Sequence, residues 1–190
     1  KKNFNYARQF WTDEYRLNSK IANYPKPFIA FMQGYTMGGG VGISCHGSHR
    51  IVCETSIISL PECSIGLIPD VGGSHLLKKI GSGIGEYLGI TGSRMSAQEA
   101  IFCNFADFYV PSERWNDLKS ELAISKNIES TIQRYAATQL KSNIERLKPF
   151  ISNIFQEADH RSIVSNLQSC KQLSHALKAI QKNSPLSMAV

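Results

Sequence analysis

Residues 34–73 read GYTMGGGVGISCHGSHRIVCETSIISLPECSIGLIPDVGG, and this stretch decides how the rest of the chain is interpreted. It follows an apolar run at residues 28–32 and soon presents three consecutive glycines, Gly38 to Gly40. Because glycine has no Cβ, such a backbone can approach a ligand closely. If a helix begins there, its first N–H groups lack intrahelical acceptors and can stabilise an oxygen that gains negative charge.

Two carboxylates of the same stretch follow prolines. Glu62 and Asp70 each come directly after a proline. Carboxylates beside an oxyanion-binding backbone are candidates for the acid, the base or the nucleophile of a reaction. Eight residues can span about 26 Å when extended, so the spacing leaves their separation open. Each also has a structural alternative, Glu62 as a solvated loop residue and Asp70 as a helix N-cap.

The apolar pattern predicts secondary structure along the whole chain. We expect helices at residues 6–23, 38–45, 72–80, 84–90 and 97–102, strands at 28–32, 50–53, 57–59 and 107–110, and a loop at 60–70. After Pro111 the sequence becomes helical in character. Helices are expected to begin at Ser112 and at Ser184-Pro185, with breaks near Lys126, Pro149 and Asp159.

Composition excludes several classes of function. The 190 residues are 42% hydrophobic and 19% charged, with a net charge of +6, which suits a globular protein with an anionic ligand. The basic residues are scattered, so no nucleic-acid partner is expected, and the apolar runs are too short to span a membrane. The five cysteines form no CxxC pair, which argues against a disulfide framework or a metal site and favours a reducing compartment. Cys45 and His46 are adjacent on a predicted helix, so we interpret them as structural and not as a dyad.

At this point the motifs resemble a known family. The segments YPKPFIAFMQGYTMGGGVGISCHGSHRIVCE (24–54), LPECSIGLIPDVGGSHLL (60–77), GEYLGITGSRMSAQEA (85–100) and FYVPSERW (108–115) resemble the 3-hydroxyisobutyryl-CoA hydrolases of the crotonase superfamily. The resemblance weakens in the C-terminal helices but reaches NSPLSMAV at the end of the chain. It implies an α/β fold, a crotonase-like spiral of ββα turns with a helical C-terminal region. Residues 1–110 would be a partial catalytic core and 111–190 the helical region, with the N-terminal part of the fold missing from this chain.

The resemblance also implies a chemistry. The substrates of this family are coenzyme A thioesters. The residue that matches the family's oxyanion donor is Gly39, through its backbone N–H, and a second donor is expected upstream of this chain. Glu62 and Asp70 match the catalytic carboxylates, and Glu14 matches a substrate-contacting glutamate, although a helical Glu14 can also be a surface charge. The implied activity is hydrolysis of a short hydroxyacyl-CoA, 3-hydroxyisobutyryl-CoA, in valine degradation. No cofactor is expected, since CoA is part of the substrate.

Position 42 separates the possible reactions. The similar enoyl-CoA hydratases place a glutamate two residues after the third glycine, where this chain has Gly42. Its absence, and the presence of Asp70, favour thioester hydrolysis. An enoyl-CoA hydratase or isomerase and a non-catalytic acyl-CoA-binding homologue remain alternatives. Two further departures are Cys63, where the family commonly has threonine, and Asp107, where it often has histidine.

The resemblance implies self-association as a homo-oligomer. It also implies a cytoplasmic location if the source is bacterial and the mitochondrial matrix if it is eukaryotic.

Overall fold

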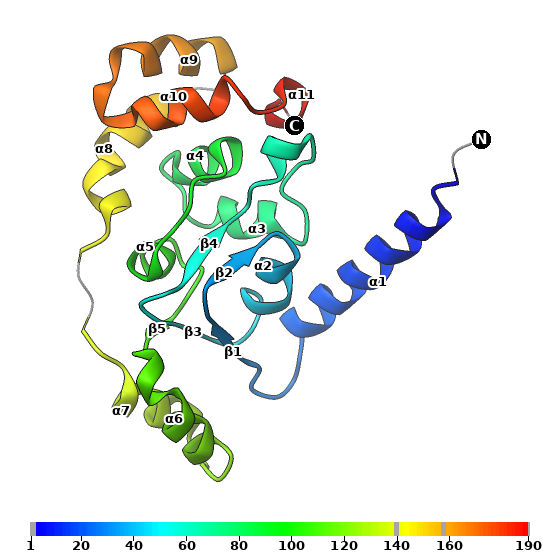
Figure 1. Cartoon of the computed structure of the whole chain (residues 1–190), viewed down its shortest axis with the longest axis vertical. Coiled ribbons are helices and arrows are strands. Elements are labelled where there is room, and N and C mark those ends of the chain that lie inside the picture. The colour runs from blue at the N-terminus through cyan, green and yellow to red at the C-terminus, as the bar shows by residue number, and fades with distance from the viewer. Residues whose placement is uncertain (1–2, 139–140, 157–158, 190) are drawn as a thin grey trace.

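The computed structural model describes residues 3–138, 141–156 and 159–189 (Figure 1). The first part of the chain forms α1 (Asn5–Ala22), β1 (Ile29–Met32), β2 (Tyr35–Met37), α2 (Gly39–Ser44), β3 (His49–Val52), β4 (Ile57–Ser59), the 3-10 helix η1 (Glu62–Ile65), α3 (Gly73–Lys78), α4 (Ile84–Thr91), α5 (Ala97–Phe102) and β5 (Phe108–Tyr109). The rest forms η2 (Ser112–Arg114), α6 (Trp115–Leu122), α7 (Ile128–Tyr135), α8 (Asn143–Phe155), α9 (His160–Ser169), η3 (Lys171–Leu173), α10 (Ser174–Ile180) and α11 (Pro185–Met188).

The strands form two small parallel sheets, which arise from a repeated ββα unit. The first unit is β1, β2 and α2, and the second is β3, β4 and α3 with η1 between strand and helix. In one sheet β3 lies between β1 and β5, and in the other β2 pairs with β4. Parallel neighbours require a crossover connection, which each turn of the chain supplies. The predicted spiral of ββα turns is therefore confirmed.

The strand β2 was not predicted, and the expected loop at 60–70 contains η1. β2 has only three residues, with Tyr35 exposed and Thr36 buried, so it is too short to show a clear alternation. The strand holds its place through its pairing with β4, in which Tyr35 is opposite Ile57. Neither feature can be read from a local pattern, because both depend on a neighbouring turn of the spiral.

The break predicted near Pro149 is wrong, because α8 continues through this residue. Proline removes one helical hydrogen bond, which normally disfavours a helix interior. In α8 the neighbouring apolar side chains Ile144, Ile151, Ile154 and Phe155 are buried in the main core. Burial of this face stabilises the helix more than its intrinsic propensity does. The breaks near Lys126 and Asp159 and the helix that begins after Ser184 are confirmed.

The main hydrophobic cluster joins the spiral to the C-terminal helices. It contains residues of β1, α2 and α4 together with residues of α8, α9 and α10. Figure 1 shows α8, α9, α10 and α11 gathered at one end of the molecule, and contacts join α8, α10 and α11 to α4. The predicted helical region also includes residues 139–140, 157–158 and 190, which lie outside the described residues.

The helix α1 extends away from this body (Figure 1) and contacts α2. Its buried residues, Asn18 and Ile21, lie in its C-terminal half, whereas Tyr6 and Phe10 are exposed. The buried part of α1 is therefore the part beside the glycine-rich segment. None of the helices in the described ranges is both long enough and apolar enough to cross a membrane.

Candidate active site

Two glutamates from distant parts of the chain lie beside two adjacent glycines of the GGG segment. A Cβ atom on Gly38 would lie 3.2 Å from Glu62 Oε1, and one on Gly39 would lie 2.8 Å from Glu14 Oε1. Gly38 also has a φ of 51°, a left-handed conformation that favours glycine. The absence of both side chains lets the carboxylates approach the backbone. The structure thus places Glu62 beside Gly38 and Glu14 beside Gly39, a proximity that the sequence left open.

The backbone N–H of Gly39 lies in the first turn of α2. Gly39 is the first residue of this helix, so its N–H has no intrahelical acceptor. Among the residues that the structure describes, no carbonyl accepts a hydrogen bond from it, whereas the N–H of Gly38 donates to the Ser59 carbonyl at 3.4 Å. This N–H is available to bind an oxygen of a ligand.

Glu62 is a buried carboxyl group with an unsatisfied oxygen. It begins η1 directly after β4 and Leu60-Pro61, is 4% exposed, and its Oε2 has no hydrogen-bond partner among the described residues. Burial disfavours the charged form, and this raises the pKa of Glu62 to about 7, with the negative charge of Asp70 adding to the effect. The alternative of a solvated loop glutamate is wrong. A buried acid that titrates near neutral pH is typical of a catalytic acid or base.

Asp70 is tied to α1, the helix that carries Glu14. The Tyr15 hydroxyl donates a hydrogen bond to Asp70 Oδ2 at 2.9 Å, which ties the loop before α3 to α1. Burial, followed by the charge of Asp70, raises the pKa of Glu14 above its ordinary value. The alternative of Asp70 as an N-cap is also wrong, since the N-cap of α3 is Gly72 and no side chain bonds there. The left-handed Gly72 begins this helix, which frees the Asp70 carboxylate for other contacts.

Glu14 is partly buried, although it lies on a largely exposed helix. Its contact with Gly39 and its raised pKa distinguish it from the surface glutamate that a helical pattern alone would allow. The two carboxylates assigned to chemistry and the one assigned to substrate contact therefore share one electrostatic environment, in which Asp70 acts on both glutamates.

Position 42 has no room for a side chain. A Cβ on Gly42 would lie 2.7 Å from Val71 Cβ and 2.9 Å from both amide atoms of Asn18. Real Cβ atoms essentially never approach other atoms so closely. The space that a glutamate would need at this position is filled by α1 and by the loop after Asp70.

Asn18 is one of three residues that sequence reasoning missed. It is 5% exposed, and neither amide atom has a hydrogen-bond partner among the described residues. The other two are Tyr15, which bonds Asp70, and His46, whose Nε2 lies 2.7 Å from the Val71 carbonyl oxygen. Asn18 follows Glu14 by four residues, which places both on one face of a helix, so this spacing was a usable signal. No local signal pointed to Tyr15, and the sequence indicated only a structural role for His46, beside Cys45.

The cysteines lie in the interior. All five are free and buried, and burial raises the pKa of Cys45 to about 11. Cys45 is therefore a thiol at neutral pH, and its neighbour His46 pairs with Val71 instead. This confirms that Cys45 and His46 are not a dyad. Within the described ranges no group of three His, Cys, Asp or Glu side chains could hold a metal ion.

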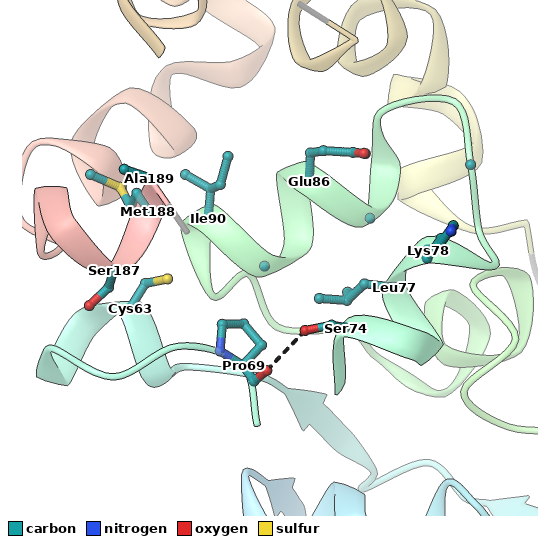
Figure 2. A pocket seen from close by; sticks show the side chains of 13 residues that line it. Cys63, Pro69, Ser74, Leu77, Lys78, Glu86, Ile90, Ser187, Met188 and Ala189 are labelled. Carbon is teal, nitrogen blue, oxygen red and sulfur yellow. Dashed lines mark hydrogen bonds between the residues drawn. The ribbon is translucent and has the colours of Figure 1, made fainter. Parts of the chain in front are cut away.

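A cavity of about 430 Å³ is lined in part by the loop that joins Glu62 to Asp70. Figure 2 shows Cys63 and Pro69 on its wall, beneath α4 and beside α11, with Ser74 Oγ donating to the Pro69 carbonyl at 3.3 Å. Neither Glu62 nor Asp70 lines this cavity. Cys63, which stands where the family commonly has threonine, therefore lies on the wall of a cavity that the carboxylates do not reach.

Asp107, the other departure from the family pattern, forms a structural ion pair. Its carboxylate accepts hydrogen bonds from the backbone N–H of Arg50 at 2.8 Å, from Nε at 2.9 Å and from Nη2 at 2.6 Å. The pair links β3 to the residue before β5. Its charge is thus used to hold two strands of the spiral.

Comparisons with known proteins identify the family of the chain. The sequence model of the enoyl-CoA hydratase/isomerase family matches residues 1–190. A curated relative from Xenopus tropicalis, named 3-hydroxyisobutyryl-CoA hydrolase, mitochondrial, is 35% identical over 194 residues, which is 95% of this chain and 49% of the relative. The chain spans about half the length of the curated relatives it matches.

Two solved structures show the same fold. A structure described as an enoyl-CoA hydratase from Rhodobacter sphaeroides 2.4.1 is 42% identical with a TM-score of 0.88, covering 97% of this chain and 53% of that chain. One described as a carnitinyl-CoA dehydratase from Mycobacterium thermoresistibile is 34% identical with a TM-score of 0.91, covering 96% of this chain and 54% of that chain.

Proposed function

The chain belongs to the enoyl-CoA hydratase/isomerase family, and we propose that within this family it hydrolyses a short hydroxyacyl-CoA thioester, 3-hydroxyisobutyryl-CoA, to the free acid and CoA. The observation that supports this most strongly is the Glu62 carboxyl, buried against Gly38 with a pKa of about 7, beside a position 42 that is closed to any side chain. The names of the curated relatives support the same substrate.

The backbone N–H of Gly39 is the proposed donor to the thioester carbonyl oxygen. As water or a nucleophile adds, this oxygen becomes negatively charged, and a fixed donor then binds it more strongly than it binds the starting carbonyl. Loss of one such donor typically raises the barrier by about 3 kcal/mol. The open N–H at the start of α2 suits this role.

Glu62 is the proposed reactive carboxylate. It attacks the thioester carbonyl, which expels the CoA thiolate and leaves a mixed anhydride for water to hydrolyse, or it removes a proton from the attacking water. Both routes require the ionised carboxylate. A pKa of about 7 leaves a substantial ionised fraction at neutral pH while keeping the group basic.

Asp70 is the proposed partner that orients water or carries the proton to the leaving thiolate. The bond from Tyr15 restrains one of its oxygens. Glu14, against Gly39, is proposed to contact the substrate next to the oxyanion donor. These roles use every carboxylate of the site and need no cofactor, since CoA enters as part of the substrate.

Hydration of an enoyl-CoA is the second candidate, because a solved structure that is 42% identical is described as an enoyl-CoA hydratase. Hydratases of this superfamily resemble the chain but use a glutamate at the position of Gly42. Val71 and Asn18 fill that space here. We therefore place hydrolysis first.

The place of this reaction would be valine degradation, with acyl-CoA as the partner molecule and a homo-oligomer as the assembly. The Xenopus tropicalis relative is named as mitochondrial. We propose the mitochondrial matrix for a eukaryotic source and the cytoplasm for a bacterial one.

The test is release of free CoA thiol from 3-hydroxyisobutyryl-CoA, followed with a thiol-reactive dye, by the full-length product of the natural gene. Glu62→Gln and Asp70→Asn are compared with the exposed control Glu113→Gln. We expect release by the wild type and the control, and a loss of at least about 100-fold in both site variants, as for other residues that act on the reacting atoms. Thiol release that is unaffected by Glu62→Gln would contradict the assignment.

A further inference from the structure

Val71, the residue after Asp70, has a strained backbone. Its φ is 47°, in the left-handed region, where a β-branched residue is a genuine outlier. A conformation of this kind is costly and persists only where surrounding contacts hold it. The strain therefore requires a restraint, and the described residues show which groups supply it.

His46 supplies the main restraint. Its Nε2 lies 2.7 Å from the Val71 carbonyl oxygen, and because a carbonyl only accepts, Nε2 is the donor. The ring also packs on Gly72, where a Cβ would lie 2.7 Å from Nε2 and 2.8 Å from Cε1. One imidazole thus fixes the two residues that follow Asp70.

A second contact holds the Val71 side chain. Its Cβ occupies the space beside Gly42, on the same helix that leads to His46. Asp70 itself is restrained by Tyr15, which bonds the carboxylate at 2.9 Å. The loop is therefore held by its carboxylate on one side and by its backbone on the other.

The helix α2 connects this restraint to the oxyanion donor. Gly39 is its first residue, and His46 lies two residues after its end at Ser44. A short, hydrogen-bonded helix is a rigid spacer, so a contact at its C-terminal end fixes Asp70 relative to the Gly39 N–H.

We propose that His46 is a positioning residue, which holds the strained Val71 by its Nε2–H and so sets the place of Asp70 relative to the Gly39 N–H. This inference rests on the proposed function for the role of Asp70 in turnover. The contact of His46 with Val71 and Gly72 is independent of that function. A cavity of about 280 Å³, lined by His46, Val71, Gly72 and Tyr15 among others, lies beside the contact, so the loop has room to relax when the bond is lost.

The test compares His46→Leu, which removes the donor, with His46→Gln, which retains an N–H of similar reach. We expect His46→Leu to lower kcat for thiol release by roughly 10–100-fold, as misplacement of a reacting group by about 1 Å does, with KM changed less than about threefold. His46→Gln should recover most of kcat. Equal losses in both variants, or a fall in thermal stability with kcat unchanged, would overturn the proposal.

A readout without turnover separates this proposal from the proposed function. The pKa of Glu62 is followed by carboxyl NMR in the wild type, in His46→Leu and in Asp70→Asn. The charge of Asp70 raises the pKa of Glu62. If Asp70 is displaced in His46→Leu, the pKa of Glu62 should therefore fall toward its value in Asp70→Asn. An unchanged pKa in His46→Leu would overturn the positioning role, whereas absence of thiol release by the wild type would overturn only the proposed function.

Discussion

Glu62 Oε1 lies against the Cα of Gly38, at the place where a side chain on that glycine would begin, and its other oxygen is buried without a partner among the described residues. The missing side chain therefore leaves room for the carboxyl group beside the backbone of the glycine segment. Burial in this site raises the pKa of Glu62 to about 7. Both the activity and the stability of the protein should therefore depend on the titration of Glu62.

The pH dependence of kcat/KM should show the titration of Glu62. Because the reaction needs its carboxylate, the rate should rise as the pH increases through about 7. Asp70→Asn removes a negative charge that raises this pKa, so the midpoint of the residual activity should move to lower pH. A midpoint that stays in place, or moves to higher pH, would contradict the coupling between the two carboxyl groups.

The protein should lose stability as the pH rises, because the buried Glu62 is more stable as the neutral acid. The pKa of Glu62 is about 7 in the folded chain against an ordinary value of 4.5, so its contribution to stability is fully present below pH 4.5 and is lost as the pH rises to about 7. Between these values the loss amounts to about 3 kcal/mol at most, at about 1.36 kcal/mol per pKa unit.

Glu62→Gln removes this titration. Relative to the wild type, the variant should therefore gain stability as the pH rises from about 4.5 to 7, in denaturant unfolding measured across that range. Glu113→Gln, at an exposed position, is the control and should show no such trend. A Glu62→Gln variant whose relative stability falls with increasing pH would show that the carboxylate is stabilised by the fold.

Gly42 and Gly40 offer a matched pair on the same helix. Ala at position 42 would meet Val71 Cβ at 2.7 Å, whereas Ala at position 40 would meet Thr36 Cγ2 at an ordinary 3.6 Å. We expect Gly42→Ala to destabilise the protein by about 1–3 kcal/mol, as overpacked cores do. Gly40→Ala should be neutral or stabilising by up to about 1 kcal/mol, since Ala favours helices. Equal unfolding free energies for the two variants would contradict the packing described at position 42.

Asp107 should matter for stability and not for chemistry. Asp107→Ala leaves the largely buried Arg50 side chain without its carboxylate partner, which should reduce the free energy of unfolding by about 2 kcal/mol. Turnover per folded molecule should remain that of the wild type. A selective loss of kcat, with stability intact, would instead connect this residue to the reaction.

Local patterns in the sequence predicted most of the elements but not all of them. The helix at Ala97–Phe102 and the strand at Ile57–Ser59 have the predicted bounds, because cap residues and apolar runs define them locally. The short strand β2 was missed, and the helix through Pro149 was wrongly divided, because the first depends on pairing and the second on burial. Tertiary contacts decided both cases.

The sequence predicted candidate residues for the site but not how they are arranged in space. The GGG and Pro-Glu motifs predicted roles for Gly39 and Glu62, but nothing in their spacing showed that Glu14 would lie beside Gly39. The contact of His46 with Val71 was also hidden, since it joins two elements that are distant along the chain, whereas the spacing of Asn18 from Glu14 offered a signal. The sequence suggested hydrolysis from the missing glutamate at position 42, and the structure adds that this position is sterically closed.

The most direct test of thioester hydrolysis offers 3-hydroxyisobutyryl-CoA and crotonyl-CoA separately to the full-length wild-type protein, and measures both free CoA and the acyl products. We predict that 3-hydroxyisobutyryl-CoA yields CoA and free acid in equal amounts, and that crotonyl-CoA is not hydrated. Consumption of crotonyl-CoA to a hydroxyacyl-CoA, with no CoA released from either compound, would contradict the hydrolase and favour the hydratase. Binding of both compounds without any product would contradict catalysis altogether.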